Sequence, residues 1–124
     1  MRAVLEGVAH RGADLVEAAE ADTGRSIAEV RIDGGMSENP TFVQALADAT
    51  GRAVEIAPVT EATTLGAAFL AGLATGVWSG LDDVAAAWRP RHTVEPSGAL
   101  DRAAWHRATE RARGWIPDLS SLDF

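Results

Sequence analysis

The feature that most constrains the fold is an apolar strand that runs into a pair of glycines and then into a helix start. The segment Val30–Ile32 alternates apolar and charged side chains, which is the two-residue period of a strand. Gly34 and Gly35 then allow a turn whose backbone angles are closed to other residues and over which no side chain blocks a ligand. Asn39 can cap a helix with its side-chain oxygen, and Pro40 suits the first helical position because it has no amide hydrogen to lose. A strand, a glycine turn and a helix N-terminus together indicate a nucleotide-binding turn.

The same residues also have a simpler interpretation. Paired glycines often only make a tight strand-to-helix turn, and an Asn before a helix is often only a cap. Asp33 lies at the strand end, where polar ligands gather in α/β sheets. Its carboxylate can contact a nucleotide or a metal, or it can bond to the turn that follows. On this pattern alone, both interpretations of Gly34, Gly35 and Asn39 stay open.

An amphipathic helix is predicted before the strand. Apolar residues recur at helical spacing between Arg2 and Ala21, while the acidic residues fall largely on other faces. The side predicted to face the core consists of Leu5, Val8, Leu15 and Val16. The segment Asp22–Gly24 is predicted to end this helix.

The glycine turn is part of a predicted strand–helix–strand unit. The first strand covers 27–32, the helix runs from Pro40 to Gly51, and a second strand covers 54–56. Such a unit predicts two parallel strands joined by a crossover helix. Two strands are too few for a stable sheet, so partner strands are expected from elsewhere.

Further helices are predicted in the second half of the chain. Thr60 is predicted to cap a helix that Gly76 ends. Small side chains three and four residues apart on it would let another backbone approach closely. They are Thr64, Ala67, Ala68, Ala71, Gly72 and Thr75. A short helix over 81–88, an extended piece over 93–95 and a last helix after a capping Asp101 follow. The side of this last helix predicted to be buried consists of Ala104, Trp105, Ala108 and Ala112, and its predicted end is Gly114.

Charge excludes several function classes. The net charge of −7 disfavours nucleic acid as a partner, because its binding needs clustered cations. The basic residues are all Arg, so chemistry that depends on a lysine, such as a P-loop or a Schiff base, is excluded. Several of them lie between Arg102 and Arg113 beside acidic residues, which predicts a solvated helix face rather than an anion site.

Composition limits the cellular compartment and the kinds of metal site that the sequence predicts. The absence of Cys excludes a thiolate metal site and predicts a cytoplasmic protein. No apolar run is long enough to predict a membrane span. His10, His92 and His106 are far apart and share no ligand spacing with acids, so no metal site is predicted.

Four motifs follow one another at a characteristic spacing. They are Asp33–Asn39, Gln44–Asp48, Glu61–Gly72 and Gly76–Trp78. The series resembles the C-terminal part of the FGGY carbohydrate kinases, the glycerol kinases most closely. The resemblance runs from about Arg2 to Trp115 and covers only the last part of such an enzyme.

The resemblance implies an α/β fold, namely a partial actin-like ATPase (ribonuclease H-like) domain with a C-terminal βαβ unit plus packed helices. This domain part is expected over 1–115, and a C-terminal tail along the surface over 116–124. In the family, the adenosine of ATP lies beside residues that match Gly34, Gly35 and Asn39, and Mg²⁺ is bound mainly outside the matched region. The small-residue helix matches the connecting helix at the hinge between two domains.

The complete enzyme that the resemblance implies transfers the γ-phosphoryl group of ATP to a hydroxyl of glycerol or a related polyol or sugar. The family's catalytic and polyol-binding residues lie upstream of the matched region, so none is assigned here. The chain alone is therefore expected to be inactive, with an N-terminal kinase half or a second copy as its partner. Two alternatives stay open: a free-standing nucleotide-binding module, and an interaction protein that docks a partner on the small-residue helix.

Overall fold

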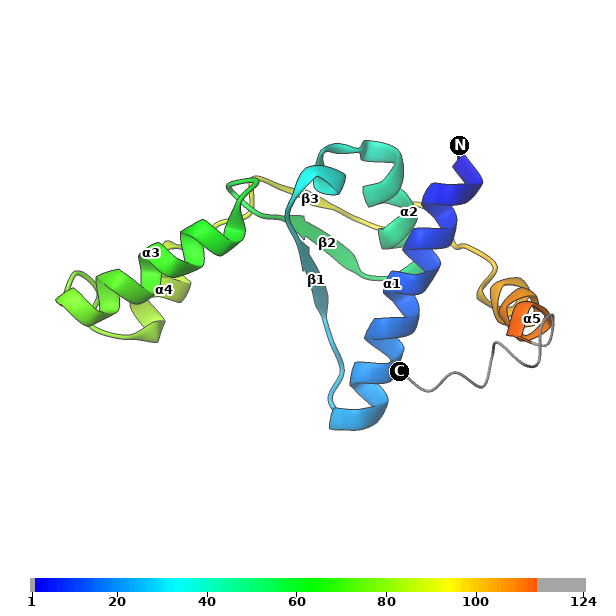
Figure 1. The fold of residues 1–124 in the computed structure, drawn as a ribbon, viewed down its shortest axis with the longest axis horizontal. Helices are drawn as coiled ribbons and strands as arrows, with labels where there is room; N and C mark the ends of the chain where they lie inside the picture. The colour runs from blue at the N-terminus through cyan, green and yellow to red at the C-terminus, as the bar shows by residue number, and fades with distance from the viewer. Residues whose placement is uncertain (1, 114–124) are drawn as a thin grey trace.

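Helices and strands alternate along the chain, as Figure 1 shows for the computed structural model, which describes residues 2–113. The elements are α1 (Arg2–Thr23), β1 (Glu29–Ile32), the short 3-10 helix η1 (Gly35–Glu38), α2 (Pro40–Thr50), β2 (Ala53–Ile56), α3 (Ala62–Thr75), α4 (Leu81–Ala87), β3 (His92–Val94) and α5 (Arg102–Arg113). This mixture confirms the predicted α/β class. None of the described helices is both long and apolar enough to cross a membrane. The predicted tail over 116–124 and the predicted helix end at Gly114 lie outside the described residues.

The sheet has three strands in the order β1-β2-β3. β1 and β2 run parallel, with Ile32 opposite Ile56, as the strand–helix–strand pattern predicts. β3 pairs antiparallel with β2 and places Val94 opposite Val54. The prediction that all partner strands come from elsewhere was therefore wrong, because the extended piece predicted over 93–95 supplies one of them. Which strand a three-residue segment pairs with is decided by tertiary contacts that local sequence does not show.

The first strand begins at Glu29, two residues later than predicted. The Ile27 amide donates to the Glu20 carboxylate at 2.7 Å, and the Ile27 carbonyl accepts from Arg52 Nε at 2.7 Å. Arg52 also binds Glu20, at 2.7 Å. Because side chains satisfy the backbone groups of Ile27, this residue needs no neighbouring strand.

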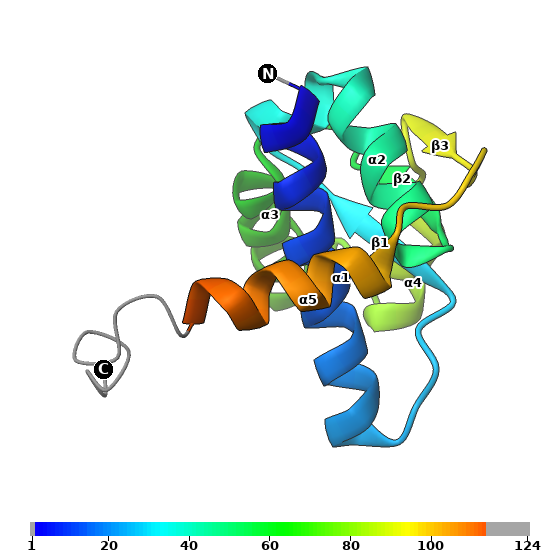
Figure 2. The same cartoon turned by 90° about the vertical axis from the view of Figure 1, so that its right-hand side faces the viewer.

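The core lies between the sheet and the two helices α1 and α2, which pack side by side (Figures 1 and 2). Its buried apolar residues are Ala9, Ala13, Phe42, Val43, Ala45, Leu46, Ala47, Ala49, Val54 and Ile56. At the helix crossing, a Cβ on Gly12 would lie 2.8 Å from Leu46 Cδ1. A methyl group at Gly12 would therefore require the end of the Leu46 side chain to shift.

The buried face of α1 agrees with the prediction at Leu5, which packs against the core, and differs elsewhere. Ala9 and Ala13 are 0% and 1% exposed, whereas Val8 and Leu15 are 46% and 69% exposed. The close approach of α2 admits only small residues, so the alanine face turns toward the core.

A helical hairpin of α3 and α4 extends away from the sheet and from α1 and α2 (Figure 1). Phe69 of α3 makes an edge-on contact with Trp78, which lies in the turn between the two helices, with ring centroids 6.0 Å apart. A Cβ on Gly72 would lie 2.5 Å from Trp78 Cδ1, so Gly72 packs against this turn. The other five residues of the predicted small-residue face are exposed.

The chain between β3 and α5 crosses α2 and is fastened there by Asp48. Its carboxylate accepts from the amides of Ser97 and Gly98 at 2.8 and 3.1 Å. Burial opposes the ionised form, but these bonds and one from Gln44 outweigh it and lower the pKa of Asp48. This fastening leads the chain to α1, which α5 crosses (Figure 2).

The predicted Asp101 cap of α5 is confirmed, since its carboxylate accepts from the Ala104 amide at 2.8 Å. The prediction of a buried side was wrong, because no residue of α5 is buried. Ala104 and Trp105 are half-buried, while Ala108 and Ala112 are exposed.

Candidate functional site

The turn after β1 is fixed by hydrogen bonds around Gly34. This residue has φ 77° and ψ −179°, a conformation that a Cβ nearly forbids. Its amide donates to the Thr60 carbonyl at 3.0 Å, and its carbonyl accepts from the Ser37 amide at 3.1 Å. The Ser37 hydroxyl donates to the same carbonyl at 2.7 Å and is buried. The turn is therefore held between the end of β1 and the segment that follows β2.

Gly35 lies beside it in a different situation. Its φ is not in the left-handed region, so the expectation that both glycines need special backbone angles is confirmed for Gly34 and wrong for Gly35. Gly35 is exposed, and a Cβ built on it would meet no described atom within 4 Å. The space over Gly35 is open to a ligand.

Asn39 caps α2, as predicted. Its side-chain oxygen accepts from the amides of Thr41 and Phe42 at 3.0 and 3.2 Å, and Pro40 is the first residue of the helix. Among the described residues, the Asn39 side-chain nitrogen has no hydrogen-bond partner. The cap thus uses the acceptor of this side chain and leaves its donor available.

Asp33 has the structural role that the sequence left open. Its carboxylate accepts from the Ala62 amide at 3.2 Å, at the first residue of α3. The predicted Thr60 cap was wrong, because Glu61 is at the N-cap position and makes no side-chain cap bond. The start of α3 is instead capped from the end of β1, 29 residues earlier in the chain, which no local pattern shows.

The turn lies where the parallel strands β1 and β2 end, at the edge where ligands bind in open α/β sheets. The N-terminus of α2 begins at the same place and carries a partial positive charge. The structure thus brings Gly34, Gly35 and Asn39 together at one end of the sheet.

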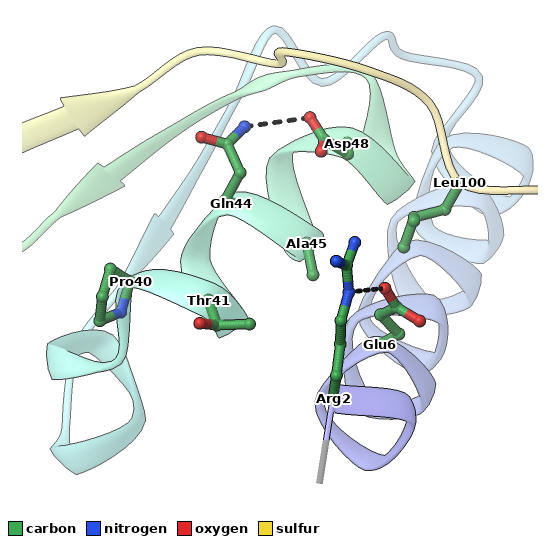
Figure 3. Close-up of a pocket in the computed structure, with 8 residues that line it drawn as sticks. All are labelled: Arg2, Glu6, Pro40, Thr41, Gln44, Ala45, Asp48 and Leu100. Carbon is green, nitrogen blue, oxygen red and sulfur yellow. Dashed lines mark hydrogen bonds and ion pairs between the residues drawn. The ribbon is translucent and has the colours of Figure 1, made fainter.

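Two cavities lie near this end. The first has a volume of about 350 Å³ and lies between the start of α1 and α2. Figure 3 shows two pairs of polar side chains that line it: Arg2 with Glu6 at 2.7 Å, and Gln44 with Asp48 at 3.0 Å. The second, of about 580 Å³, lies between η1 and β3. The residues that line them do not include Gly34, Gly35 or Asn39. The candidate site therefore lies outside both cavities.

A second polar cluster, which sequence reasoning missed, lies between α1 and α5. Possible metal-ligand atoms of Asp14, Glu17 and His106 lie within 4.8 Å of one another, a grouping that spacing along the sequence does not show. The guanidinium of Arg102 binds both carboxylates and offsets part of their charge. The predicted solvated face of α5 thus does not include Arg102, whose side chain is 18% exposed.

The electrostatics of this cluster follow from these bonds. Burial opposes ionisation of Asp14, but hydrogen bonds from Arg102 and Trp105 outweigh it and lower the pKa of Asp14 to about 2. The partners are 88 and 91 residues apart in the chain. The cluster is an arginine-centred ion-pair network, which could be found only from the tertiary structure.

Comparison with known proteins decides the family. Residues 1–75, which contain the turn, match the family model of the FGGY family of carbohydrate kinases, C-terminal domain. The chain belongs to this family. A glycerol kinase of Dechloromonas aromatica is 46% identical to this FGGY chain over 119 residues, which are 92% of the chain and 24% of that protein. A glycerol kinase of Deinococcus radiodurans is 43% identical over 122 residues, 94% of the chain and 24% of that protein.

A solved structure agrees with this. The crystal structure of Plasmodium falciparum glycerol kinase with ADP aligns with a TM-score of 0.69 and 29% identity, over 99% of this FGGY chain and 24% of that one. The predicted actin-like ATPase fold is thereby confirmed. The FGGY chain is a glycerol kinase-like C-terminal domain that spans about a quarter of the length of the relatives it matches.

Proposed function

We propose that this chain is the C-terminal portion of an ATP-dependent carbohydrate kinase of the glycerol kinase type, and that Gly34, Gly35 and Asn39 bind the adenosine of ATP. The observation that carries the proposal is the open glycine turn at the end of the parallel strands, beside an Asn whose amide nitrogen is available. The P. falciparum relative, whose structure contains ADP, supports a nucleotide as the ligand.

Each residue has a separate task in this proposal. Gly34 fixes the turn through its unusual backbone angles, and Gly35 lets the nucleoside approach the backbone. Asn39 donates from its amide nitrogen while its oxygen holds the start of α2. The resulting contact positions ATP for transfer to a polyol or sugar that the rest of the enzyme binds.

Mg²⁺ would neutralise the phosphates in such a transfer, but the described residues around the turn do not fit a site for it. The carboxylate of Asp33 caps α3, and that of Glu38 pairs with Arg91 at 2.6 Å. We therefore assign Mg²⁺ binding mainly to parts of the enzyme outside this chain.

In the same proposal, α3 contributes the hinge to the preceding domain. Its residues from Ala62 to Thr75 include no charged side chain, although most of them are exposed. Leu70 is 68% exposed on this helix. An uncharged, exposed helix with small side chains suits close packing against another domain.

The first prediction tests whether this chain needs the rest of the enzyme for phosphoryl transfer. The isolated chain should not phosphorylate glycerol, since it holds no assigned catalytic base. A chimera that carries this chain in place of the matching C-terminal part of the D. aromatica glycerol kinase should phosphorylate glycerol with ATP, and a coupled ADP-release assay measures both. The matched control is the same kinase truncated before this part.

Two results would contradict the proposal. One is ATP-dependent phosphorylation by the isolated chain. The other is a folded chimera that binds glycerol but transfers no phosphoryl group. Tight ATP binding by the isolated chain without transfer would instead indicate the free-standing nucleotide-binding module.

A further inference from the structure

Helix α5 is attached to the rest of the chain by side-chain contacts rather than by a shared core. None of its residues is buried, and none belongs to the apolar core between the sheet, α1 and α2. Figure 2 shows α5 crossing α1. Two of its side chains, Arg102 and Trp105, make most of the hydrogen bonds to α1.

Arg102 makes the central contact. Its guanidinium donates to the carboxylates of Asp14 and Glu17, and to the His10 carbonyl at 2.9 Å. The same group lies 3.1 Å from His10 Nδ1 and 3.2 Å from His106 Nε2. An arginine has only donors, so Nδ1 of His10 must offer a lone pair to Arg102. The contact is lost when this nitrogen is protonated.

Trp105 fixes the same histidine from its ring face. The Trp105 and His10 rings stack with centroids 5.0 Å apart and an interplanar angle of 4°. The indole N–H donates to Asp14 at 3.0 Å. His10 is thus held between two side chains of α5, one of which requires its lone pair.

We propose that the attachment of α5 to α1 is an acid-sensitive latch, which opens when His10 takes up a proton at Nδ1 and Arg102 loses this acceptor. The charged neighbours of His10 act in both directions. Glu6 and Asp14 on α1 favour the imidazolium, while Arg102 and His106 on α5 oppose it. Release of α5 leaves the core of α1, α2 and the sheet intact, because α5 contributes nothing to it.

The direction of the pH effect follows from linkage. Burial, and after it the charge of Arg102, lower the pKa of His10 in the attached state. The attached state therefore binds fewer protons, so attachment is complete above the usual imidazole pKa of about 6.5 and is lost as the pH falls below it. Asp14, with a pKa of about 2, stays ionised over this range and does not cause the change.

Amide hydrogen exchange of the full chain tests the latch at about pH 7.5 and about pH 5.5, one unit above and below the usual imidazole pKa. After correction for intrinsic exchange rates, the protection of α5 should fall by up to about tenfold at the lower pH, since a tenth of free imidazole is then neutral. Protection of α2 should change little. Unchanged protection of α5 would overturn the proposal.

Variants identify the groups responsible. The variant His10→Gln keeps an acceptor that can face Arg102 and cannot titrate, so the protection of α5 should no longer depend on pH. His92→Gln, an exposed position on β3, is the matched control and should keep the dependence. A pH dependence that persists in the His10→Gln variant would overturn the proposal.

A second measurement decides the case in which α5 does not attach at all in the His10→Gln variant. In the unmodified chain, the indole N–H resonance of Trp105 should shift with the same midpoint as the ring protons of His10. A different midpoint for the two signals would separate α5 release from histidine protonation and would overturn the proposal.

Discussion

Leu46→Ala is expected to lower the free energy of unfolding by about 2 to 5 kcal/mol, the cost of emptying a well-packed core position. Leu46 is 4% exposed and lies where α1 and α2 cross. Domains of this size are stable by only about 5 to 15 kcal/mol, so the loss is a large part of the total. Urea unfolding followed by circular dichroism measures it.

Gly12 provides a sharper test of the same contact. Replacing a helical glycine by alanine stabilises a helix by about 1 kcal/mol. In the unmodified chain the new Cβ would lie 2.8 Å from Leu46 Cδ1, so overpacking offsets this gain. In the Leu46→Ala background that atom is gone, and Gly12→Ala should become clearly stabilising.

Gly7 on the same helix is the matched control. A Cβ there would lie 3.9 Å from the nearest atom, on Trp105, which is an ordinary contact. Gly7→Ala should therefore stabilise both backgrounds equally. If Gly12→Ala had the same effect in both backgrounds, the helix contact described here would be wrong.

Local signals predicted the turn and its supports correctly. Gly34 has the positive φ expected of a glycine turn, Asn39 caps α2, and Gly51 ends it in the left-handed conformation. The parallel pairing of β1 with β2 also followed from the strand–helix–strand order. Each of these depends on residues close together in the chain, which is why sequence alone shows them.

The features that the sequence did not show depend on residues far apart. Periodicity predicted that Val8 and Leu15 on α1 face the core. The close approach of α2 instead buries the alanine face of α1. The sequence around Arg102, with arginines beside acidic residues, predicted a solvated helix face. Only the contact of Arg102 with Asp14, 88 positions away, shows that this residue joins α5 to α1. The binding roles of Gly34, Gly35 and Asn39 remain a proposal, which a nucleotide experiment must decide.

The nucleotide experiment uses the chimeric kinase described above. Asn39→Asp is expected to weaken ATP binding by about 1 to 3 kcal/mol, or about 5- to 150-fold in Kd, because it removes the amide donor and adds negative charge beside a polyanion. The melting temperature should barely move, since Asp caps a helix about as well as Asn. Isothermal titration calorimetry and a thermal melt measure the two effects.

Two further variants separate the causes. Asn39→Ser keeps the cap and loses the donor without adding charge, so it should weaken ATP binding less than Asn39→Asp does.

Gly35→Ala adds a methyl group that meets no described atom and strains no backbone angle, so any loss of ATP affinity in this variant indicates a ligand over the turn. Gly34→Ala, by contrast, should lower stability as well, because its φ of 77° disfavours a Cβ. Unchanged ATP affinity in both Asn39→Asp and Gly35→Ala, with the fold intact, would show that Asn39 is only a helix cap and that the nucleotide binds elsewhere.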